Sequence, residues 1–352
     1  MSSNSSRFDA LKRKVYLDLL GLQEVCVNAV NKLRKSKQQS QCMSGTTTLI
    51  TGGNAGIGRA TAEELVRRGS DVVIACRNLV TAEETALALR QLDPYFDTLG
   101  TIEIAHVDLA SLNSVRSLVS TLSSRKKPFN CIIASAGLMT PPVRLETEDG
   151  FENQFQVNYL SHFLLIHELL KISKHEYKRT GQKPPRCVFL SSMTHFGATL
   201  EKDLDNNLQG KISYNPFTCY ANSKLCQLLA AKEFNRRMND NSGEFPAGGA
   251  AVACHPGIVN TALARQYFKD QVPKVLLPIA SPILDNLLFP VFLKTPKGAA
   301  ECVLFAATAP ADEVGGEYVQ ECAVARSSGA SNDVALTSRL WKKSKELAGL
   351  EE

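Results

Sequence analysis

A glycine-rich turn between a strand pattern and a helix pattern constrains this chain more than any other feature. Residues 46–69 read TTTLITGGNAGIGRATAEELVRRG: a short β-rich run, a turn with Gly52, Gly56 and Gly58, and then a helical apolar pattern. Such a unit presents backbone N–H groups and a helix N-terminus to a phosphate group. Glycine lets the backbone approach the phosphate because it carries no Cβ atom. The turn therefore predicts a nucleotide site after the first strand.

Two other phosphate-binding patterns do not fit this turn. A P-loop requires G-x-x-x-x-G-K-[ST], but Arg59 and Ala60 follow Gly58, so the phosphate-binding lysine and the magnesium-binding hydroxyl are both missing. The pattern G-x-G-x-x-G also fails as written, because the pattern present is T-G-x-x-x-G-x-G. The strand–turn–helix context still indicates a dinucleotide.

The end of the second predicted strand bears on which dinucleotide binds. Residues 71–78 read DVVIACRN, so the strand end holds Cys76 and Arg77 and no carboxylate. A carboxylate at this place would bind the ribose 2′-hydroxyl of NAD. A guanidinium can instead receive a 2′-phosphate through two parallel hydrogen bonds. Arg77 therefore favours NADP(H), while NAD(H) stays possible.

Strand and helix patterns alternate along the rest of the chain. Apolar strand-like runs, each ending in small or polar residues, lie at 102–110, 129–137, 186–192 and 250–261. The alternation predicts an α/β fold with a Rossmann-type, doubly wound parallel sheet and ligands at the carboxyl ends of its strands. We assign this single domain to residues 46–325 and a C-terminal tail to residues 326–352.

The positive charge of the protein is concentrated in residues 1–45. Eight Lys or Arg and three acidic residues there account for the whole formal net charge of +5. The remaining charges balance, which gives no basis for nucleic-acid binding. Apolar residues at spacings of three and four predict one amphipathic helix over 8–33, and residues 34–45 form a polar linker.

Two roles stay open for this N-terminal helix. It could pack on the body of the protein or on a dimer partner, or it could bind a membrane surface through its apolar face. No apolar run of about 18 residues predicts a transmembrane helix. The ten cysteines form no C-x-x-C pair and show no zinc spacing. We therefore expect reduced thiols, an intracellular location and no metal site.

The stretch YANSK at 220–224 supplies candidate acid–base chemistry. Tyr220 and Lys224 are four residues apart, which puts both side chains on one face of a helix. A phenol beside an ammonium group can move a proton to or from a carbonyl oxygen. The pattern is short and also fits an ordinary helix, so its meaning depends on the motifs around it.

With these motifs together, residues 46–320 resemble the short-chain dehydrogenase/reductase family. The motifs are TGGNAGIG (51–58), DLAS (108–111), ASAG (134–137), NYLSHF (158–163), LSS (190–192), YANSK (220–224) and HPGIVNT (255–261). Stretches such as VVIACRN and FLKTPKGAAECVLFAAT are similar to the retinol-dehydrogenase-like and polyprenol-dehydrogenase-like branch.

The resemblance implies an enzyme that interconverts a lipophilic alcohol with its aldehyde or ketone. Retinoid, polyprenoid and steroid-like substrates fit that branch, with NADP(H) or NAD(H) as the cofactor. The branch often works at the endoplasmic reticulum membrane, so we expect a peripheral membrane protein, with the cytoplasm as the alternative. An oligomer is possible.

The resemblance also implies roles for individual residues. Tyr220 would donate or accept the proton, and Ser192 would hold and polarise the substrate oxygen. Lys224 would lower the pKa of Tyr220 and bind the nicotinamide ribose, and Asn158 would hold a water in the proton relay. The residues expected at the cofactor are Gly52, Asn54, Gly56, Ile57, Gly58, Arg77, Asp108, Leu109, Ser135, Gly137, Tyr220, Lys224, Pro256, Gly257 and Thr261.

Two departures from the family pattern stand out. The usual NNAG reads ASAG, so Ser135 replaces an asparagine that braces the central strands, and we expect rearranged bracing. Residues 193–219 form a long insertion that should cover the site. Its His195 would be a surface residue or a substrate contact.

Residues 262–293 follow the last motif and are apolar, with four prolines that forbid one long helix. In the family this region covers the substrate. It would form an apolar substrate flap, or pack into the core as two short helices.

Two other functions share these motifs. One is a non-catalytic NADP(H)-binding regulator, for which the altered ASAG is the only hint. The other is a C=C reductase of the protochlorophyllide-reductase type, whose cysteine-rich substrate region is not obvious here. The complete catalytic set favours the alcohol–carbonyl oxidoreductase.

Overall fold

A computed structural model gives the structure of most of the chain. It describes residues 41–125, 128–200, 203–210, 214–240, 242–261, 264–265, 269, 272–273, 276–289 and 293–350. The amphipathic helix expected over 8–33 lies outside these residues. Within the described part, no helix is both long and apolar enough to cross a membrane.

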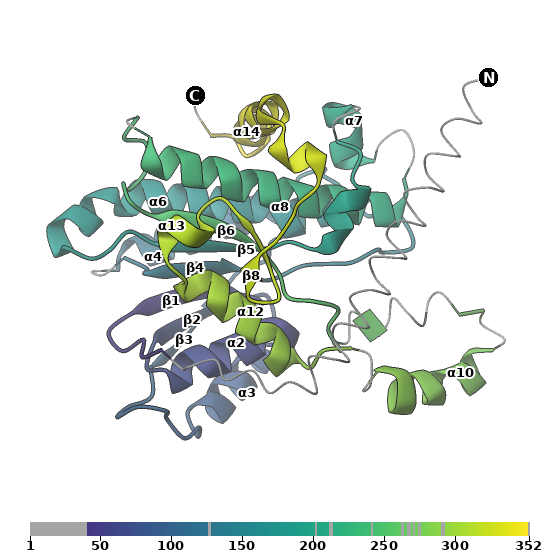
Figure 1. Ribbon diagram of the computed structural model, residues 1–352, viewed down its shortest axis with the longest axis horizontal. Helices are drawn as coiled ribbons and strands as arrows, with labels where there is room; N and C mark the ends of the chain where they lie inside the picture. Colours follow the sequence, from purple (N-terminus) through teal and green to yellow (C-terminus); the bar gives the residue numbers. More distant parts are fainter. Residues whose placement is uncertain are drawn as a thin grey trace.

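A sheet of eight strands forms the centre of the fold (Figure 1). The strands are β1 (Thr47–Thr51), β2 (Asp71–Cys76), β3 (Ile102–His106), β4 (Cys131–Ala134), β5 (Arg186–Leu190), β6 (Ala250–His255), β7 (Tyr318–Gln320) and β8 (Ala323–Val324). They lie in the order β3-β2-β1-β4-β5-β6-β7-β8, and only the β7–β8 pair is antiparallel. The predicted doubly wound parallel sheet is confirmed.

Helices cover both faces of the sheet (Figure 1). One layer contains α2 (Gly56–Arg67), α3 (Leu79–Leu89) and α12 (Pro296–Thr308). The other contains α4 (Leu112–Ser123), α6 (Ser161–Thr180), α8 (Pro216–Asn239) and α14 (Val334–Leu347). Shorter helices are α5 (Asn153–Phe155), α7 (Leu204–Gln209), α10 (Leu277–Ile283) and α13 (Ala311–Val314), with 3₁₀ turns at Met193–Gly197 and Gly329–Asn332 and π-helical turns at Gln156–Leu160 and Leu284–Leu288.

The central strands are apolar on both sides because a helix layer covers each face. β1 and β6 are buried at every position. Leu49 packs into the layer of α4, α6 and α8, whereas its neighbour Ile50 packs into the layer of α2 and α12. Strands with two buried faces read as continuous apolar runs, which is why these strands were recognisable in the sequence.

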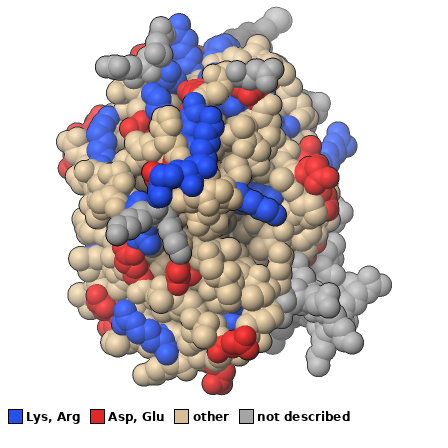
Figure 2. Space-filling model, turned by 90° about the vertical axis from the view of Figure 1, so that its left-hand side faces the viewer, with Lys and Arg blue, Asp and Glu red and all other residues tan. Residues whose placement is uncertain are grey.

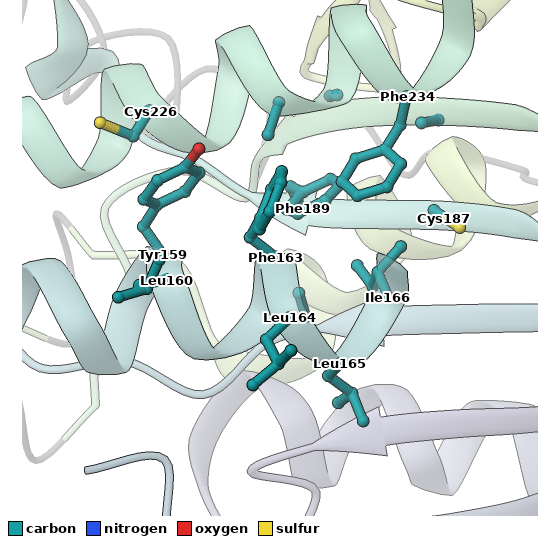
Figure 3. Close-up of a cluster of buried hydrophobic side chains, with 14 of the residues drawn as sticks. Tyr159, Leu160, Phe163, Leu164, Leu165, Ile166, Cys187, Phe189, Cys226 and Phe234 are labelled. Atoms are coloured by element: carbon teal, nitrogen blue, oxygen red, sulfur yellow. The ribbon is translucent and has the colours of Figure 1, made fainter. Parts of the chain in front are cut away.

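An aromatic cluster joins α6 and α8 to the sheet (Figure 3). The ring centroid of Phe234 on α8 lies 5.5 Å from that of Phe163 on α6 and 5.9 Å from that of Phe189 on β5. All three side chains are fully buried. Burying one such side chain contributes about 1.5–3 kcal/mol. The cluster therefore fixes the position of α8, the helix that carries Tyr220 and Lys224.

The segment assigned as a C-terminal tail is instead part of the core. Helix α14 buries Leu336, Leu340 and Trp341 in the same cluster as α6 and α8. The Trp341 ring lies 4.9 Å from the Phe163 ring, and the Arg237 guanidinium lies 4.4 Å above Trp341. The tail assignment over 326–352 was wrong because charged residues on the outer face of α14 hide a narrow apolar stripe.

Arg186 at the start of β5 provides a test of how α12 is held. Its guanidinium donates to the carbonyl oxygens of Ala306 at 2.7 Å and Ala309 at 2.8 Å, where α12 ends. We expect Arg186→Met to lower the free energy of unfolding by about 1.5–3 kcal/mol, because two carbonyls lose a charged donor. Arg179→Met, which removes an exposed guanidinium paired with Glu176, should cost much less, because an exposed ion pair adds little stability. Urea unfolding measures both, and equal losses would contradict this role.

Glu244 provides a test of stability against pH. Its carboxylate lies 3.6 Å from Nε2 of His167 and accepts a 2.6 Å hydrogen bond from Arg237. These two groups, His167 first, lower the pKa of Glu244 to about 2. A lowered carboxyl pKa adds stability that is present above the unfolded-state pKa and is lost as pH falls toward 2. Between pH 5 and pH 2, unfolding free energy should therefore fall more steeply in the parent than in Glu244→Gln. Parallel curves would show that the pair adds nothing.

Candidate active site

The predicted site residues gather at the carboxyl ends of four neighbouring strands. β1 leads into the glycine turn at Gly52, β4 into Ser135, β5 into Ser192 and β6 into Pro256. These strands lie side by side in the order β1-β4-β5-β6. The chain leaves β1 and β4 for opposite faces of the sheet, and ligands of doubly wound folds bind at such a point.

The glycine turn has room only for glycine. Gly52 has a φ of +68°, and a Cβ atom added there would lie 3.0 Å from Cα of Ala136. A Cβ atom on Gly58 would lie 2.3 Å from the carbonyl oxygen of Gly52. Helix α2 begins at Gly56 with no side-chain cap and no acidic residue in its first turn. No side chain caps its first N–H groups, and a glycine turn before such a helix end is a typical binding place for the diphosphate of a dinucleotide.

The next two strand ends bring Arg77 and Asp108 together. The Arg77 guanidinium lies 3.9 Å from the Asp108 carboxylate, and 74% of the arginine side chain is exposed. Asn54 in the glycine turn donates to Thr81 of α3 at 2.7 Å, which connects the turn to this edge. The main chain of Leu109 is held by Ser161, whose hydroxyl donates to its carbonyl at 2.6 Å.

Tyr220 and Lys224 lie one turn apart on α8 and face the end of β5. The helix begins after Asn215, whose side chain accepts from the N–H of Thr218 at 2.9 Å. The Tyr220 hydroxyl is hydrogen-bonded to the Ser192 side chain. The Lys224 ammonium lies 5.4 Å from the centre of the Tyr220 ring. Phenol, hydroxyl and ammonium thus form one cluster that can bind a carbonyl oxygen and exchange a proton with it.

Burial dominates the proton affinities in this cluster. It lowers the pKa of Lys224 to about 7, because the residue is only 6% exposed and its charged form loses contact with water. It raises the pKa of Tyr220, and the hydrogen bond from Ser192 opposes that rise. Burial therefore raises the pKa of Tyr220, whereas we expected from the sequence that Lys224 would lower it.

The side chain and the backbone carbonyl of Asn158 are both hydrogen-bonded to other groups of the protein. Its side-chain oxygen accepts from the N–H of Leu138 at 2.7 Å, and its amide nitrogen donates to the Leu138 carbonyl and to Ser223, both at 3.0 Å. Its backbone carbonyl accepts from Nδ1 of His162 at 2.9 Å and from the Gln227 amide at 2.7 Å. A carbonyl oxygen has two lone pairs. The water that the resemblance implies at Asn158 would have to displace a protein group.

The bracing between β1 and β4 is rearranged around Thr51. Its hydroxyl oxygen accepts from the N–H groups of Ser135 at 3.0 Å and Ala136 at 3.1 Å. With both lone pairs used, it donates its proton to Nε2 of His162 at 2.8 Å. Burial lowers the pKa of His162 to about 4, so the ring is neutral and accepts this bond. Thr51 and His162 thus brace the strands at the position where the family uses an asparagine.

The residues that follow β6 are the last of the predicted site residues. Gly257 has a φ of +95°, and a Cβ atom there would lie 2.8 Å from the Lys294 side chain. The methyl group of Thr261 would meet a Cβ atom on Gly56 at 3.3 Å, so Thr261 faces the glycine turn. A Cβ atom on Gly137 would lie 3.1 Å from Asn158 and 3.9 Å from the Lys224 ammonium. These short distances bring Thr261 close to the glycine turn, and Asn158 and Lys224 close to Gly137.

His195 is buried, so the expectation of a surface residue was wrong. It is 1% exposed. Its Nδ1 lies 2.7 Å from the carbonyl oxygen of Ser192, and its Nε2 accepts from the N–H of Ser328 at 3.1 Å. Burial lowers its pKa to about 4, so the ring is neutral. These contacts connect the loop after β5 to the segment before α14.

The insertion between Ser192 and Tyr220 packs on the loop after β4. The Arg144 side chain donates to the carbonyl of Gln209 at 3.1 Å, and the Tyr214 hydroxyl donates to that of Pro141 at 2.7 Å. The described part of residues 193–219 is thereby held against the loop that follows β4.

The two ends of the flap lie next to each other. Lys294 N–H donates to the carbonyl of Ile258 at 2.9 Å, and Asn260 N–H donates to the carbonyl of Lys294 at 2.8 Å. The excursion between them contains α10 and a π-helical turn, so no single long helix forms in its described part. Leu276, Ile283 and Leu288 in this excursion are 51%, 48% and 36% exposed.

Within the described ranges, no group of three His, Cys, Asp or Glu side chains could hold a metal ion. On the face in Figure 2, the coloured Lys and Arg side chains lie among Asp and Glu.

The chain is similar to proteins of a known family. Residues 46–199 match the family described as short chain dehydrogenase. Human retinol dehydrogenase 14 is 34% identical over 331 residues, which cover 91% of this chain and 91% of that protein. Human polyprenol dehydrogenase is 34% identical, with 86% of this chain and 84% of that protein covered.

Among solved structures, a protein assigned as an NAD(P)-dependent gluconate 5-dehydrogenase from Beutenbergia cavernae, with bound NADP, has the same fold. It is 22% identical with a TM-score of 0.55, and the match covers 79% of this chain and 95% of that one. This chain therefore belongs to the short-chain dehydrogenase family, as an oxidoreductase related to the retinol and polyprenol dehydrogenases.

Proposed function

We propose that this protein is an NADP(H)-dependent oxidoreductase that interconverts a lipophilic alcohol and its aldehyde or ketone. The observation that carries the proposal is the Tyr220 hydroxyl, bonded to Ser192 and one helical turn from the buried ammonium of Lys224. The group lies at the end of β5, beside a glycine turn with the shape of a diphosphate site.

A bound nicotinamide supplies the hydride chemistry, and the chain supplies placement and the proton. Ser192 donates a hydrogen bond to the substrate oxygen and orients it. In reduction, Tyr220 gives its proton to that oxygen as the alkoxide forms; in oxidation, it takes the proton back. Lys224 stabilises the phenolate that remains on Tyr220 through its charge and would hold the nicotinamide ribose. The buried cluster excludes water from this exchange.

The cofactor preference rests on Arg77. Its guanidinium is mostly exposed and meets only one carboxylate oxygen, at 3.9 Å. A 2′-phosphate there would gain charge-assisted hydrogen bonds that a 2′-hydroxyl cannot match. NAD(H) remains the alternative cofactor.

The substrate class rests on the relatives and on the flap. Retinol and polyprenol dehydrogenases are named for long apolar alcohols. The exposed leucine and isoleucine side chains of the flap offer apolar surface next to the site. A peripheral position on an intracellular membrane, such as that of the endoplasmic reticulum, would supply such a substrate, and the N-terminal segment 8–33 would contribute to binding it.

Tyr220→Phe tests the chemistry. It should lower kcat for a retinoid, polyprenoid or steroid carbonyl with NADPH by about 10²–10⁴-fold, because the proton donor is lost. Tyr177→Phe is the control, since its buried hydroxyl bonds the Phe129 carbonyl far from the site. Assays run with and without lipid vesicles. NADPH binding without turnover of any substrate would support a non-catalytic role instead, and full activity in Tyr220→Phe would exclude the mechanism.

Arg77→Glu tests the cofactor preference. It should raise KM for NADPH at least about tenfold while KM for NADH stays equal or falls, because the carboxylate repels a 2′-phosphate. Arg90→Glu reverses an exposed charge at the end of α3 and serves as the control. Equal changes in KM for the two cofactors would assign the preference to another residue.

A further inference from the structure

Gln227 is a buried polar residue that neither the family motifs nor the mechanism above uses. It lies on α8, three residues after Lys224, and is fully buried. Its side-chain oxygen accepts a 3.0 Å hydrogen bond from the Lys224 ammonium. Its side-chain nitrogen donates a 2.7 Å hydrogen bond to the backbone carbonyl of Asn158. One amide thus joins two members of the predicted catalytic set.

Its partner on the other side is the carbonyl in the π-helical turn Gln156–Leu160. π-helical turns change the backbone register by one residue and are frequent at functional sites. The Asn158 carbonyl accepts from Gln227 and from Nδ1 of His162. Both of its lone pairs are therefore used by side chains.

The surroundings of Lys224 make this contact important. An ammonium has three N–H donors, and Lys224 gives one to Gln227 and one to the Leu190 carbonyl at 2.7 Å. The titratable groups that face it are Tyr220 on its own helix and His162 on α6, and burial keeps His162 neutral. In the described part of the chain, no carboxylate pairs with Lys224. Its charge is stabilised by neutral acceptors alone.

We infer that Gln227 is a positioning residue for Lys224, which fixes the direction of the ammonium and sets its proton affinity through one neutral acceptor. The inference rests on the proposed function, because it gives Gln227 its purpose in an alcohol–carbonyl oxidoreductase. The alternative is that Gln227 only fills space and satisfies polar groups between α6 and α8.

An amide is suited to this position because it both donates and accepts. A glutamate there would accept from Lys224 but, as a carboxylate, could not donate to the Asn158 carbonyl. It would also place a negative charge against the ammonium and favour the protonated form. A methionine would fill a similar volume while removing both hydrogen bonds, so it isolates the effect of the amide.

The titration of Lys224 tests the inference without requiring turnover. Protein with ¹³C-labelled lysine side chains is titrated by NMR, and the Lys224 signal is assigned from its loss in Lys224→Arg. In Gln227→Met the midpoint should fall by about half a unit or more, because the charged form loses an acceptor. In Gln227→Glu it should rise by about one unit or more.

Gln156→Met is the matched control. Gln156 is equally buried, but its amide nitrogen bonds Asp149, at 2.6 Å, and not Lys224. The control should lose a similar amount of stability and leave the Lys224 midpoint unchanged. With an active substrate, kcat should fall about tenfold in Gln227→Met and less than about twofold in the control.

A Lys224 midpoint in Gln227→Met that matches the parent would overturn the inference. So would an equal shift in Gln156→Met, since that would be a general effect of losing buried polar contacts. If the parent protein turned over no substrate, the proposed function would fail, while the titration would still decide the role of Gln227. The two failures are therefore distinguishable.

Discussion

The hydroxyl group of Thr51 holds together the ends of β1 and β4, the two strands from which the chain leaves for opposite faces of the sheet. It accepts from two N–H groups after β4 and donates a hydrogen bond to Nε2 of His162. His162 in turn donates to the carbonyl of Asn158. If this buried chain were broken, the polar groups in it would lose their partners away from water, at about 1–3 kcal/mol each. The glycine turn, the end of β4 and the π-helical turn keep their spacing because this chain is complete.

Much of the fold and most of the candidate site could be predicted from the sequence. The glycine turn and the Tyr220–Lys224 pair depend only on local backbone and helix geometry, so both can be recognised in the sequence itself. The short strands β7 and β8 and the docking of α14 depend on partners far away in the chain, which no local pattern reveals. His162 and Gln227 were missed for a related reason: polar residues occur on both faces of a helix pattern, and only the packed structure shows which of them point inward.

Burial has two effects in this site. It gives the candidate catalytic cluster a fixed geometry, because Lys224, His162 and Gln227 have no room to move and few other partners. It also shifts proton affinities, lowering that of Lys224 and raising that of Tyr220. A site built in this way depends on which polar neighbours complete it. The neutral amide of Gln227 and the neutral ring of His162 keep additional charge out of a region where each charge has a large effect.

The hydrogen bonds between Ile258, Asn260 and Lys294 have a consequence for how such proteins diversify. They bring the two ends of this segment next to each other, and its described residues contain no strand of the sheet. A segment attached in this way can change in length and composition while the strand ends and α8 stay in place, because its closure costs little and its removal opens no gap in the sheet. The strand ends and α8 would keep the catalytic residues in place, while residues 262–293 could change in sequence to fit a different substrate.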